Sequence, residues 1–306
     1  MTKPPHGPLR FHTLDVFTHS IFGGKPLAVF ENGDALAQND MAALAQEFNL
    51  AAAAFLCAPR DPVNSARLRV FAPHGEERRF SAQAVIGVAI LLARTRAAEI
   101  LARREVVVVL EAADEIFSCE VIQSKSGVCY AQFAMNRVAK QDGDAPCAEM
   151  LAAALALTPQ DIGFKAHAPR IYSAFAPFVF VPVGSRAALE RACPSPALFP
   201  KILAAAAGLY LYTADTIAPD SAIHARLFGP GGIEDPASGA AAAAFAGTAH
   251  EFERPEDGEH QIFIEQGHKI GRPSRLTLRV SVVAGALVNI HLGGQAVEVA
   301  RGELTP

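Results

Sequence analysis

The sequence predicts an α+β or mixed α/β fold made of two similar halves. Short strand-like runs rich in Val, Leu and Phe recur along the whole chain, whereas helical segments are few, which argues against a helix bundle. A motif of the first half also returns in the second half. The chain of 306 residues is long enough for two domains of about 150 residues each. Hydrophobic residues make up 51% of the chain and charged residues 19%, so the chain contains enough apolar side chains for a buried core.

The expected elements follow from periodicity and from capping residues. Strand-like runs cover residues 10–16, 26–30, 53–56, 67–71, 105–110, 128–135, 171–183, 208–213, 222–228, 261–265, 275–283, 286–292 and 295–301. Helices are expected at residues 39–48, 83–96, 147–155, 186–193 and 238–246. Asn39 is expected to cap the first helix, because Met41, Leu44 and Phe48 share one face after it. The polar stretch 140–146 contains Gly and Pro and predicts a linker or long loop.

An internal repeat relates the two halves. Residues 69–77 and 226–234 share the pattern R-apolar-F-x-P-x-G-x-E at an offset of 157 residues. The same offset relates Ser81 to Ser238, and each serine precedes an Ala-rich helical stretch. Two similar lobes would face each other across a cleft, and each would direct a serine-capped helix N-terminus toward it. Because free N–H groups at helix N-termini attract anions, we expect a small carboxylate ligand there.

Composition excludes several classes of protein and site. The net charge of -4 argues against a strongly basic surface that would bind nucleic acid. No uninterrupted apolar run reaches about 18 residues, so no transmembrane helix and no membrane partner are expected. The N-terminal ten residues are polar and contain no apolar signal core. The five cysteines are dispersed without a C-x-x-C pair, which predicts no disulfide framework, no structural zinc and a reducing, cytoplasmic compartment.

Several motifs resemble those of the PhzF-like proteins, which are named for an isomerase of phenazine biosynthesis. They are D-V-F-T at 15–18, F-G-G-K-P-L-A-V at 22–29, G-I-E-D-P-A-S-G-A at 232–240, E-Q-G at 265–267, G-R-P-S at 271–274 and G-G-Q-A-V at 293–297. The similarity extends from about residue 11 to residue 304, nearly the whole chain.

This resemblance implies a diaminopimelate epimerase-like α+β fold, with two pseudo-symmetric lobes that are each a curled sheet or barrel around a central helix. We expect a first lobe at residues 1–125, joined by the C-terminal strand at about 296–306, and a second lobe at 126–295. The resemblance also implies a homodimer, an active site between the lobes, no cofactor and no metal. The characterised member of the family moves a proton in a dihydro-hydroxyanthranilate.

The resemblance also assigns the site residues, and here the sequence departs from the family. Ala52 stands at the position of the family's acid/base Glu, Gln83 at that of its His, and Ala240 at that of its Ser. Asp235 alone keeps the family's polar residue and becomes the candidate catalytic group. The residues expected to bind substrate are Ser81, Gln83, Ser238, Gly239, Ala240 and Ala52.

Each candidate also has a purely structural interpretation. Asp235 is favoured near a helix N-terminus by the helix dipole, and Ser81 and Ser238 are favoured as N-caps. Gln83 is a polar residue of a first helical turn, and Gly239 allows tight packing. Two functions therefore remain open. One is a cofactor-independent isomerase or epimerase that transfers a proton through Asp235. The other is a catalytically reduced relative that binds a small anion or acts as an interaction protein. A dinucleotide oxidoreductase is disfavoured, because no G-x-G-x-x-G opens a helix.

Overall fold

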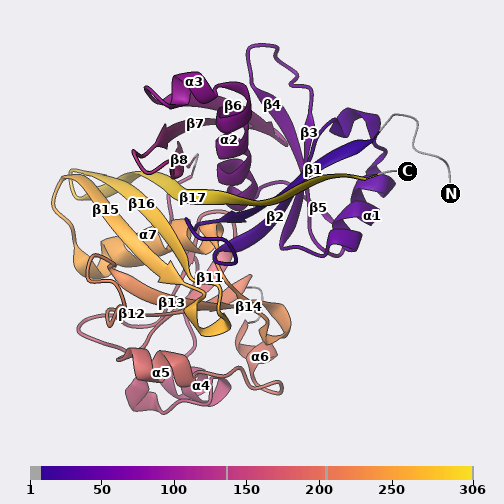
Figure 1. Cartoon of the computed structure of the whole chain (residues 1–306). Coiled ribbons are helices and arrows are strands. Elements are labelled where there is room, and N and C mark those ends of the chain that lie inside the picture. Colours follow the sequence, from indigo (N-terminus) through magenta and orange to yellow (C-terminus); the bar gives the residue numbers. More distant parts are fainter. Residues whose placement is uncertain (1–7, 136, 204–205, 305–306) are drawn as a thin grey trace. The chain divides into compact units, whose positions relative to one another are not determined.

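The computed structural model of the chain describes residues 8–135, 137–203 and 206–304. The chain forms two units, of which one comprises Met1–Ala134 with Gly293–Pro306 and the other Met135–Leu292 (Figure 1). The first unit therefore includes β8 (Cys129–Ala134), and its N-terminal segment extends to Ala134, whereas the sequence suggested residue 125. Each unit is a curled sheet around one central helix, and the predicted α+β fold with two pseudo-symmetric lobes is confirmed.

Both units contain more strands than helices. The first unit contains β1 (Leu9–Val16), β2 (Lys25–Phe30), α1 (Gln38–Phe48), β3 (Ala52–Cys57), β4 (Ala66–Phe71), β5 (Glu77–Arg78), α2 (Ala82–Arg96), α3 (Ala98–Leu101), β6 (Val106–Ala112), β7 (Glu115–Gln123) and β8. The second contains β9 (Lys140–Gln141), α4 (Ala148–Ala154), β10 (Arg170–Ser173), β11 (Pro177–Pro182), α5 (Arg186–Arg191), α6 (Phe199–Leu203), β12 (Gly208–Thr213), β13 (Ile223–Phe228), β14 (Glu234–Asp235), α7 (Gly239–Glu253), β15 (Gly258–Gln266) and β16 (Ser274–Val283). Strand β17 (Ala286–Leu304) begins in the second unit and ends in the first.

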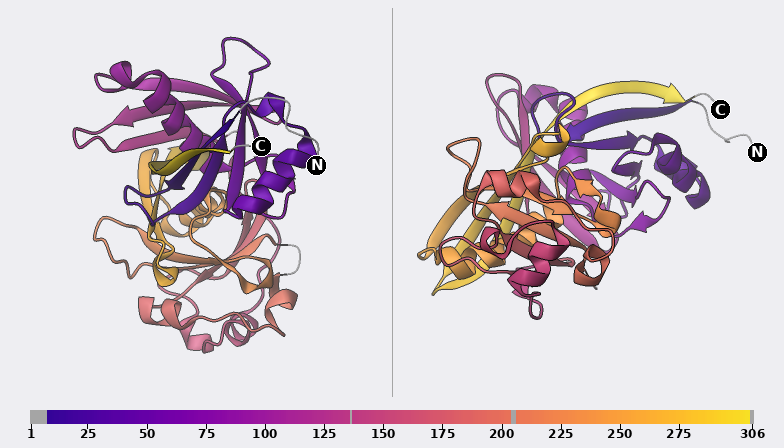
Figure 2. Two further views of the ribbon diagram at one scale, coloured as in Figure 1. Left: turned by 45° about the vertical axis from the view of Figure 1, so that its right-hand side comes forward. Right: turned by 90° about the horizontal axis from the view of Figure 1, so that it is seen from below.

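The first unit wraps its strands around α2. Strand β2 pairs in parallel with β3, β3 is antiparallel to β4, β4 is parallel to β6, and β6, β7 and β8 form an antiparallel meander. The C-terminal part of β17 lies beside β1 (Figure 2). All residues of α2 from 82 to 93 are buried. A helix that is apolar around its circumference must be covered on every side, which the curled sheet achieves. Helix α1 packs on the outer face of the same strands.

The second unit repeats this order of elements. Strand β11 is parallel to β12, β12 is antiparallel to β13, and β13 is parallel to β15, which pairs with β16. Helix α7 takes the central place, and its residues 241–249 are all buried. The short β14 closes a hairpin with β13 in the register Phe228↔Glu234, and β5 does so with β4 in the register Phe71↔Glu77. The outer face of the sheet is covered by α4, α5 and α6.

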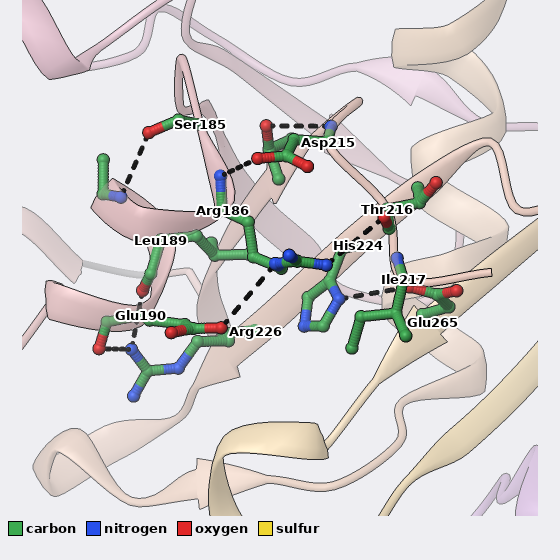
Figure 3. A network of polar contacts seen from close by, with 12 residues as sticks. Ser185, Arg186, Leu189, Glu190, Asp215, Thr216, Ile217, His224, Arg226 and Glu265 are labelled. Carbon is green, nitrogen blue, oxygen red and sulfur yellow. Dashed lines mark hydrogen bonds and ion pairs between the residues drawn. The ribbon is translucent and has the colours of Figure 1, made fainter. Parts of the chain in front are cut away.

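An arginine–glutamate pair fastens each of these hairpins. Arg69 donates two hydrogen bonds to the Glu77 carboxylate at 2.7 and 2.6 Å. Arg226 does the same to Glu234 at 3.0 and 2.7 Å. Such bidentate pairs fix direction as well as distance. Arg226 is buried, and it also donates to the backbone carbonyls of Leu189, Glu190 and Ala192 at the end of α5. Figure 3 shows Arg226 beside Leu189 and Glu190. It thus joins the hairpin to the outer helical layer.

A second repeated contact is a carboxylate that holds loop backbone. Glu111 accepts hydrogen bonds from the N–H groups of Arg60 and Asp61 and from the Asn64 amide. The Asn64 amide, followed by the two backbone donors, lowers the pKa of Glu111 to about 2. In the second unit, Glu265 accepts hydrogen bonds from the N–H groups of Ile217 and Ala218 at 2.9 and 2.6 Å, and Figure 3 shows Glu265 beside Ile217. Burial by itself raises the pKa of Glu265, but the backbone donors outweigh it and the pKa lies below its usual range.

Several expectations about single elements need correction. Asn39 does not cap α1, because the helix starts at Gln38 and Ala37 occupies the N-cap position. The run 171–183 is a hairpin of β10 and β11 rather than one strand. The runs 286–292 and 295–301 form the single strand β17, in which Gly293 does not turn the chain and leaves room for the Tyr130 ring. The break at 140–146 contains β9, which pairs with β10.

The low pKa of Glu111 makes stability depend on pH. Because the folded pKa of about 2 lies below the ordinary value of 4.5, the ionised carboxylate stabilises the fold fully above the ordinary value, and this contribution is lost as the pH falls through the range between the two. Glu111→Gln should therefore lower the free energy of unfolding at about pH 7 and have a much smaller effect at about pH 3. Urea unfolding at both pH values measures this. Glu105→Gln, which neutralises an exposed carboxylate, is the control. An equal loss at both pH values would contradict the assignment.

Candidate functional site

The predicted catalytic residue lies where the β13–β14 hairpin meets the N-terminus of α7. Asp235 pairs directly with Leu227, which in turn pairs with Tyr210 of β12. Directly paired residues place their side chains on the same face of a sheet. The Tyr210 ring contacts Phe245 of α7 at a centroid distance of 6.2 Å, so this is the face that covers the helix. By this pairing Asp235 lies on the inner face of the sheet, where it is half-buried beside the start of α7.

The turn between Asp235 and α7 is organised by side chains. The Asp235 Oδ1 atom accepts a hydrogen bond from the Ala237 N–H at 3.0 Å. Ser238 is the N-cap of α7, and its Oγ atom accepts from the Ala241 N–H at 3.2 Å. The next positions, Gly239 and Ala240, form the first turn of the helix. A helix leaves the N–H groups of its first turn without intrahelical acceptors, and they suit an anionic group.

The E-Q-G motif positions this turn from the side. Gln266 is completely buried, and its Nε2 atom donates to the Asp235 backbone carbonyl at 2.7 Å. Gly267 has a φ of 78°, and a Cβ atom there would meet the carbonyl oxygens of Pro236 and Arg272. Only glycine allows the backbone of the two turns to approach so closely. The motif thus fixes the backbone from which the Asp235 carboxylate projects.

Tyr210 is a candidate that the sequence analysis missed. Its ring is fully buried, and within the described residues its hydroxyl group has no hydrogen-bond partner. Burial, with a smaller contribution from the charge of Asp235, raises the pKa of Tyr210 far above its usual value, so the hydroxyl keeps its proton. A buried donor without a partner is costly and marks a place where a ligand group could accept a hydrogen bond. No sequence signal distinguishes Tyr210 from other strand residues, because its relation to Asp235 depends on strand register.

The first unit presents a different set of groups at the corresponding helix end. Ser81 is the N-cap of α2, and its Oγ atom accepts from the Ala84 N–H at 3.3 Å. Gln83 is buried, and its amide donates to the carbonyls of Lys25 and Pro26 at 2.9 and 2.7 Å. Its nitrogen therefore ties β2 to α2. Ala52 is fully buried in β3 beside Leu27.

Two buried cysteines are not suited to act as bases. Burial raises the pKa of the Cys57 thiol to about 11 and that of Cys119 to about 12, so neither is a thiolate base near neutral pH. Among the described residues, no group of three His, Cys, Asp or Glu side chains is arranged to hold a metal ion. Within the same part of the chain, no helix is long and apolar enough to span a membrane.

Comparison with known proteins places the chain in a family. The profile of the phenazine biosynthesis-like proteins (PhzC-PhzF) matches residues 14–302. The chain belongs to this family. An uncharacterized isomerase of Mesorhizobium japonicum is 37% identical over 297 residues, which cover 95% of this chain and 96% of that protein. The trans-2,3-dihydro-3-hydroxyanthranilate isomerase of Pseudomonas aeruginosa is 28% identical over 96% of this chain and 98% of its own. The crystal structure of a PhzF-family protein of Bacillus anthracis has a TM-score of 0.86 at 22% identity and covers 98% of this chain and 100% of that one.

The packing of Gly267 against the Pro236 turn can be tested with a matched glycine. Gly271 has a similar φ of 70°, but a Cβ atom there would meet nothing within 4 Å. Gly267→Ala should therefore lower the free energy of unfolding by on the order of 1–3 kcal/mol more than Gly271→Ala, since only the former adds overpacking to backbone strain. Chemical unfolding of both variants measures the difference. Equal losses would show that the turn around Asp235 does not depend on this contact.

Proposed function

We propose that this PhzF-family chain is an isomerase or epimerase-type enzyme that transfers a proton on a small carboxylic acid, with Asp235 as the acid/base. The observation that carries the proposal is the placement of Asp235, which is half-buried at the N-terminus of α7 and held there by Gln266 and Ala237. The family membership and the isomerase relatives support the reaction class.

The ligand carboxylate would sit at the first turn of α7. The N–H groups of Gly239 and Ala240 point out of the helix start, and the helix dipole favours a negative charge there. Ala240 has a methyl side chain, which leaves the approach to these N–H groups open. Ser238 completes this end by satisfying the Ala241 N–H. Binding of the carboxylate would orient the reacting carbon toward Asp235.

A site with a single carboxylate base is suited to isomerisation rather than to inversion at one carbon. A single base on one face of the substrate can remove a proton from one carbon and return it to another on the same face, which is an isomerisation. Inversion at one carbon requires groups on two opposite faces. Because Asp235 is the group that the sequence retains at the family's catalytic positions, we favour isomerisation. A carboxylate is a weak base, so the substrate proton would have to be acidified by conjugation with a carbonyl or a double bond.

The Tyr210 hydroxyl would stabilise the charge that develops on the substrate. Its proton is retained, it is shielded from water, and Asp235 contributes to its electrostatic environment. A preorganised donor of this kind is most effective where charge appears in the transition state. The first-unit candidates Ser81, Gln83 and Ala52 carry no group that titrates near neutral pH, so we assign them no proton-transfer step.

The remaining features of the proposal come from the family resemblance. They are a homodimer and a reaction without a cofactor. The cytoplasmic location is proposed on a different ground, the five dispersed cysteines. Size-exclusion chromatography with light scattering measures the oligomeric state of the purified chain.

A second function, binding of a small carboxylate without turnover, is favoured by a specific observation. Ala52 and Ala240 cannot exchange protons, and the Gln83 amide nitrogen is committed to the carbonyls of Lys25 and Pro26. The chain would then bind an anion at the N-terminus of α7 without catalysing a reaction.

Solvent deuterium incorporation separates the two functions. The chain is incubated in D2O with small amino and hydroxy carboxylic acids, including cyclic ones, and the acids are analysed by mass spectrometry. Asp235→Asn keeps the acceptor for the Ala237 N–H but removes the base, so incorporation should fall at least about 100-fold. Asp220→Asn, which neutralises an exposed carboxylate paired with Arg275, is the control.

The outcomes are distinct. Incorporation that is unchanged in Asp235→Asn would overturn the role of Asp235. Absence of incorporation, together with thermal stabilisation by one of the acids, would establish the binding function instead.

Tyr210→Phe offers a further test, because its effects on stability and turnover should differ in direction. Removing a buried hydroxyl that has no hydrogen-bond partner among the described residues should leave the free energy of unfolding unchanged or raise it. The rate of incorporation should fall by roughly 10- to 100-fold. Tyr172→Phe removes a hydroxyl that donates to Glu251 at 3.0 Å, and should cost about 1 kcal/mol of stability without slowing turnover. A Tyr210→Phe variant of full activity would remove Tyr210 from the proposed site.

A further inference from the structure

A cavity lies within the second unit, at the C-terminal half of α7. Its volume is about 310 Å³. Phe245, Ala249 and Glu253 line it from one face of the helix, as expected for residues four apart. Ile262 of β15 and the segment around His167 enclose it from other sides. Helix α7 has 15 residues and a length of roughly 20 Å, so this cavity is separate from the Asp235 turn at the opposite end.

The walls are largely apolar, and small side chains create the space. Ala246 and Ala249 stand on the cavity side of α7, where larger residues would fill the gap to β15 and β16. Phe164 closes one side and stacks on His167 at 4.5 Å with an interplanar angle of 19°. A cavity of this volume with apolar walls and a few polar groups is typical of a site for a small molecule.

A chain of hydrogen bonds holds one charged group at the cavity. Burial raises the pKa of Tyr212 far above its usual value, so its hydroxyl keeps a proton and donates to His167 Nδ1 at 2.9 Å. His167 is buried, and in its neutral form it then carries its proton on Nε2 and donates to Glu253 Oε1 at 2.8 Å. The Glu253 carboxylate is thereby oriented, while its side chain remains 55% exposed.

The other polar groups at the cavity are mainly acceptors. His250 donates from Nε2 to the Gly285 carbonyl at 3.0 Å, and His260 donates from Nε2 to the Glu256 carbonyl at 2.7 Å. In the neutral rings Nδ1 is therefore an acceptor. The carbonyl end of the α7 dipole adds negative potential. Lys165 is the cationic side chain among the lining residues, and it is exposed.

We propose that this cavity binds a small amine with an apolar, ring-sized body. The ammonium group would bind Glu253 near the C-terminus of α7, and the body would pack against Phe245, Ala249 and Ile262. The complementarity rests on one oriented carboxylate, acceptor nitrogens and a helix end that favours cations. The site is independent of the proposed reaction at Asp235, and its ligand has the opposite charge to that of the proposed substrate.

The test compares three probes of similar size. Isothermal titration calorimetry of the full chain near pH 7 uses 2-phenylethylamine, 2-phenylethanol and 3-phenylpropanoate. The amine should bind one site per chain, at least about tenfold more tightly than the alcohol, and the carboxylate should bind more weakly still. A carboxylate that binds as tightly as the amine, or an amine that does not saturate, would overturn the proposal.

Variants locate the site. Glu253→Gln keeps the acceptor for His167 and removes the charge, so amine affinity should fall about tenfold while alcohol affinity is unchanged. Glu259→Gln makes the same charge change on β15 at the residue beside His260, on the opposite face, and should have no effect. Ala249→Leu should abolish binding of both probes by filling the cavity. Because Ala249→Leu could destabilise the fold, its thermal transition is compared with that of the wild type. The Glu253→Gln variant is the deciding test. Unchanged amine affinity in Glu253→Gln would overturn the assignment.

Discussion

The constraint on which each unit depends is a central helix without a polar face. Helix α2 is buried at every residue from 82 to 93, and α7 at every residue from 241 to 249. Such a helix has no side that can face water, so the sheet must curl around it. The Ala-rich composition of α7 helps, because small side chains let strands approach, as Gly247 does for the Tyr172 ring. Both proposed ligand sites accordingly lie at the ends of a helix. The Asp235 turn occupies one end of α7, and the Glu253 cavity lies near the other.

The contacts that occur in both units distinguish residues of the framework from residues with a proposed chemical role. The Arg69–Glu77 pair has its counterpart 157 residues later in Arg226–Glu234, and both units cap their central helix with serine. In both units these groups fix the same two points, the hairpin and the start of the central helix. Asp235 does not recur, since Arg78 occupies the corresponding place in the first unit. A group that breaks the repeat is not required by the framework, which adds to the case for a functional role.

The site also illustrates how a weak acid can be given a defined role. The Asp235 carboxylate is a short side chain on a turn, and turns are mobile unless they are tied down. Here Gln266 fixes the carbonyl of the same residue, and Gly267 lets the neighbouring backbone pack closely against Pro236. The E-Q-G and E-D-P motifs are distant in sequence and act as one unit in space. In the proposed reaction, restricting the carboxylate to one position would lower the entropy cost of bringing it to the substrate.

The sequence by itself determined the fold class, the family and the two helix N-termini, because periodicity, capping serines and contiguous motifs are local properties. Asp235, Ser81 and Ser238 could be placed at helix starts from the same local signals. Tertiary structure decided what local patterns do not contain. The pairing Tyr210–Leu227–Asp235 depends on strand register, and the cavity at Glu253 depends on which residues of α7, β15 and the segment before β10 converge. The sequence predicts Gln83 as a substrate-binding residue, and the folded chain adds that its amide nitrogen donates to backbone carbonyls. These contacts join residues that are far apart in the sequence, so their geometry exists only once the sheet has closed around its helix.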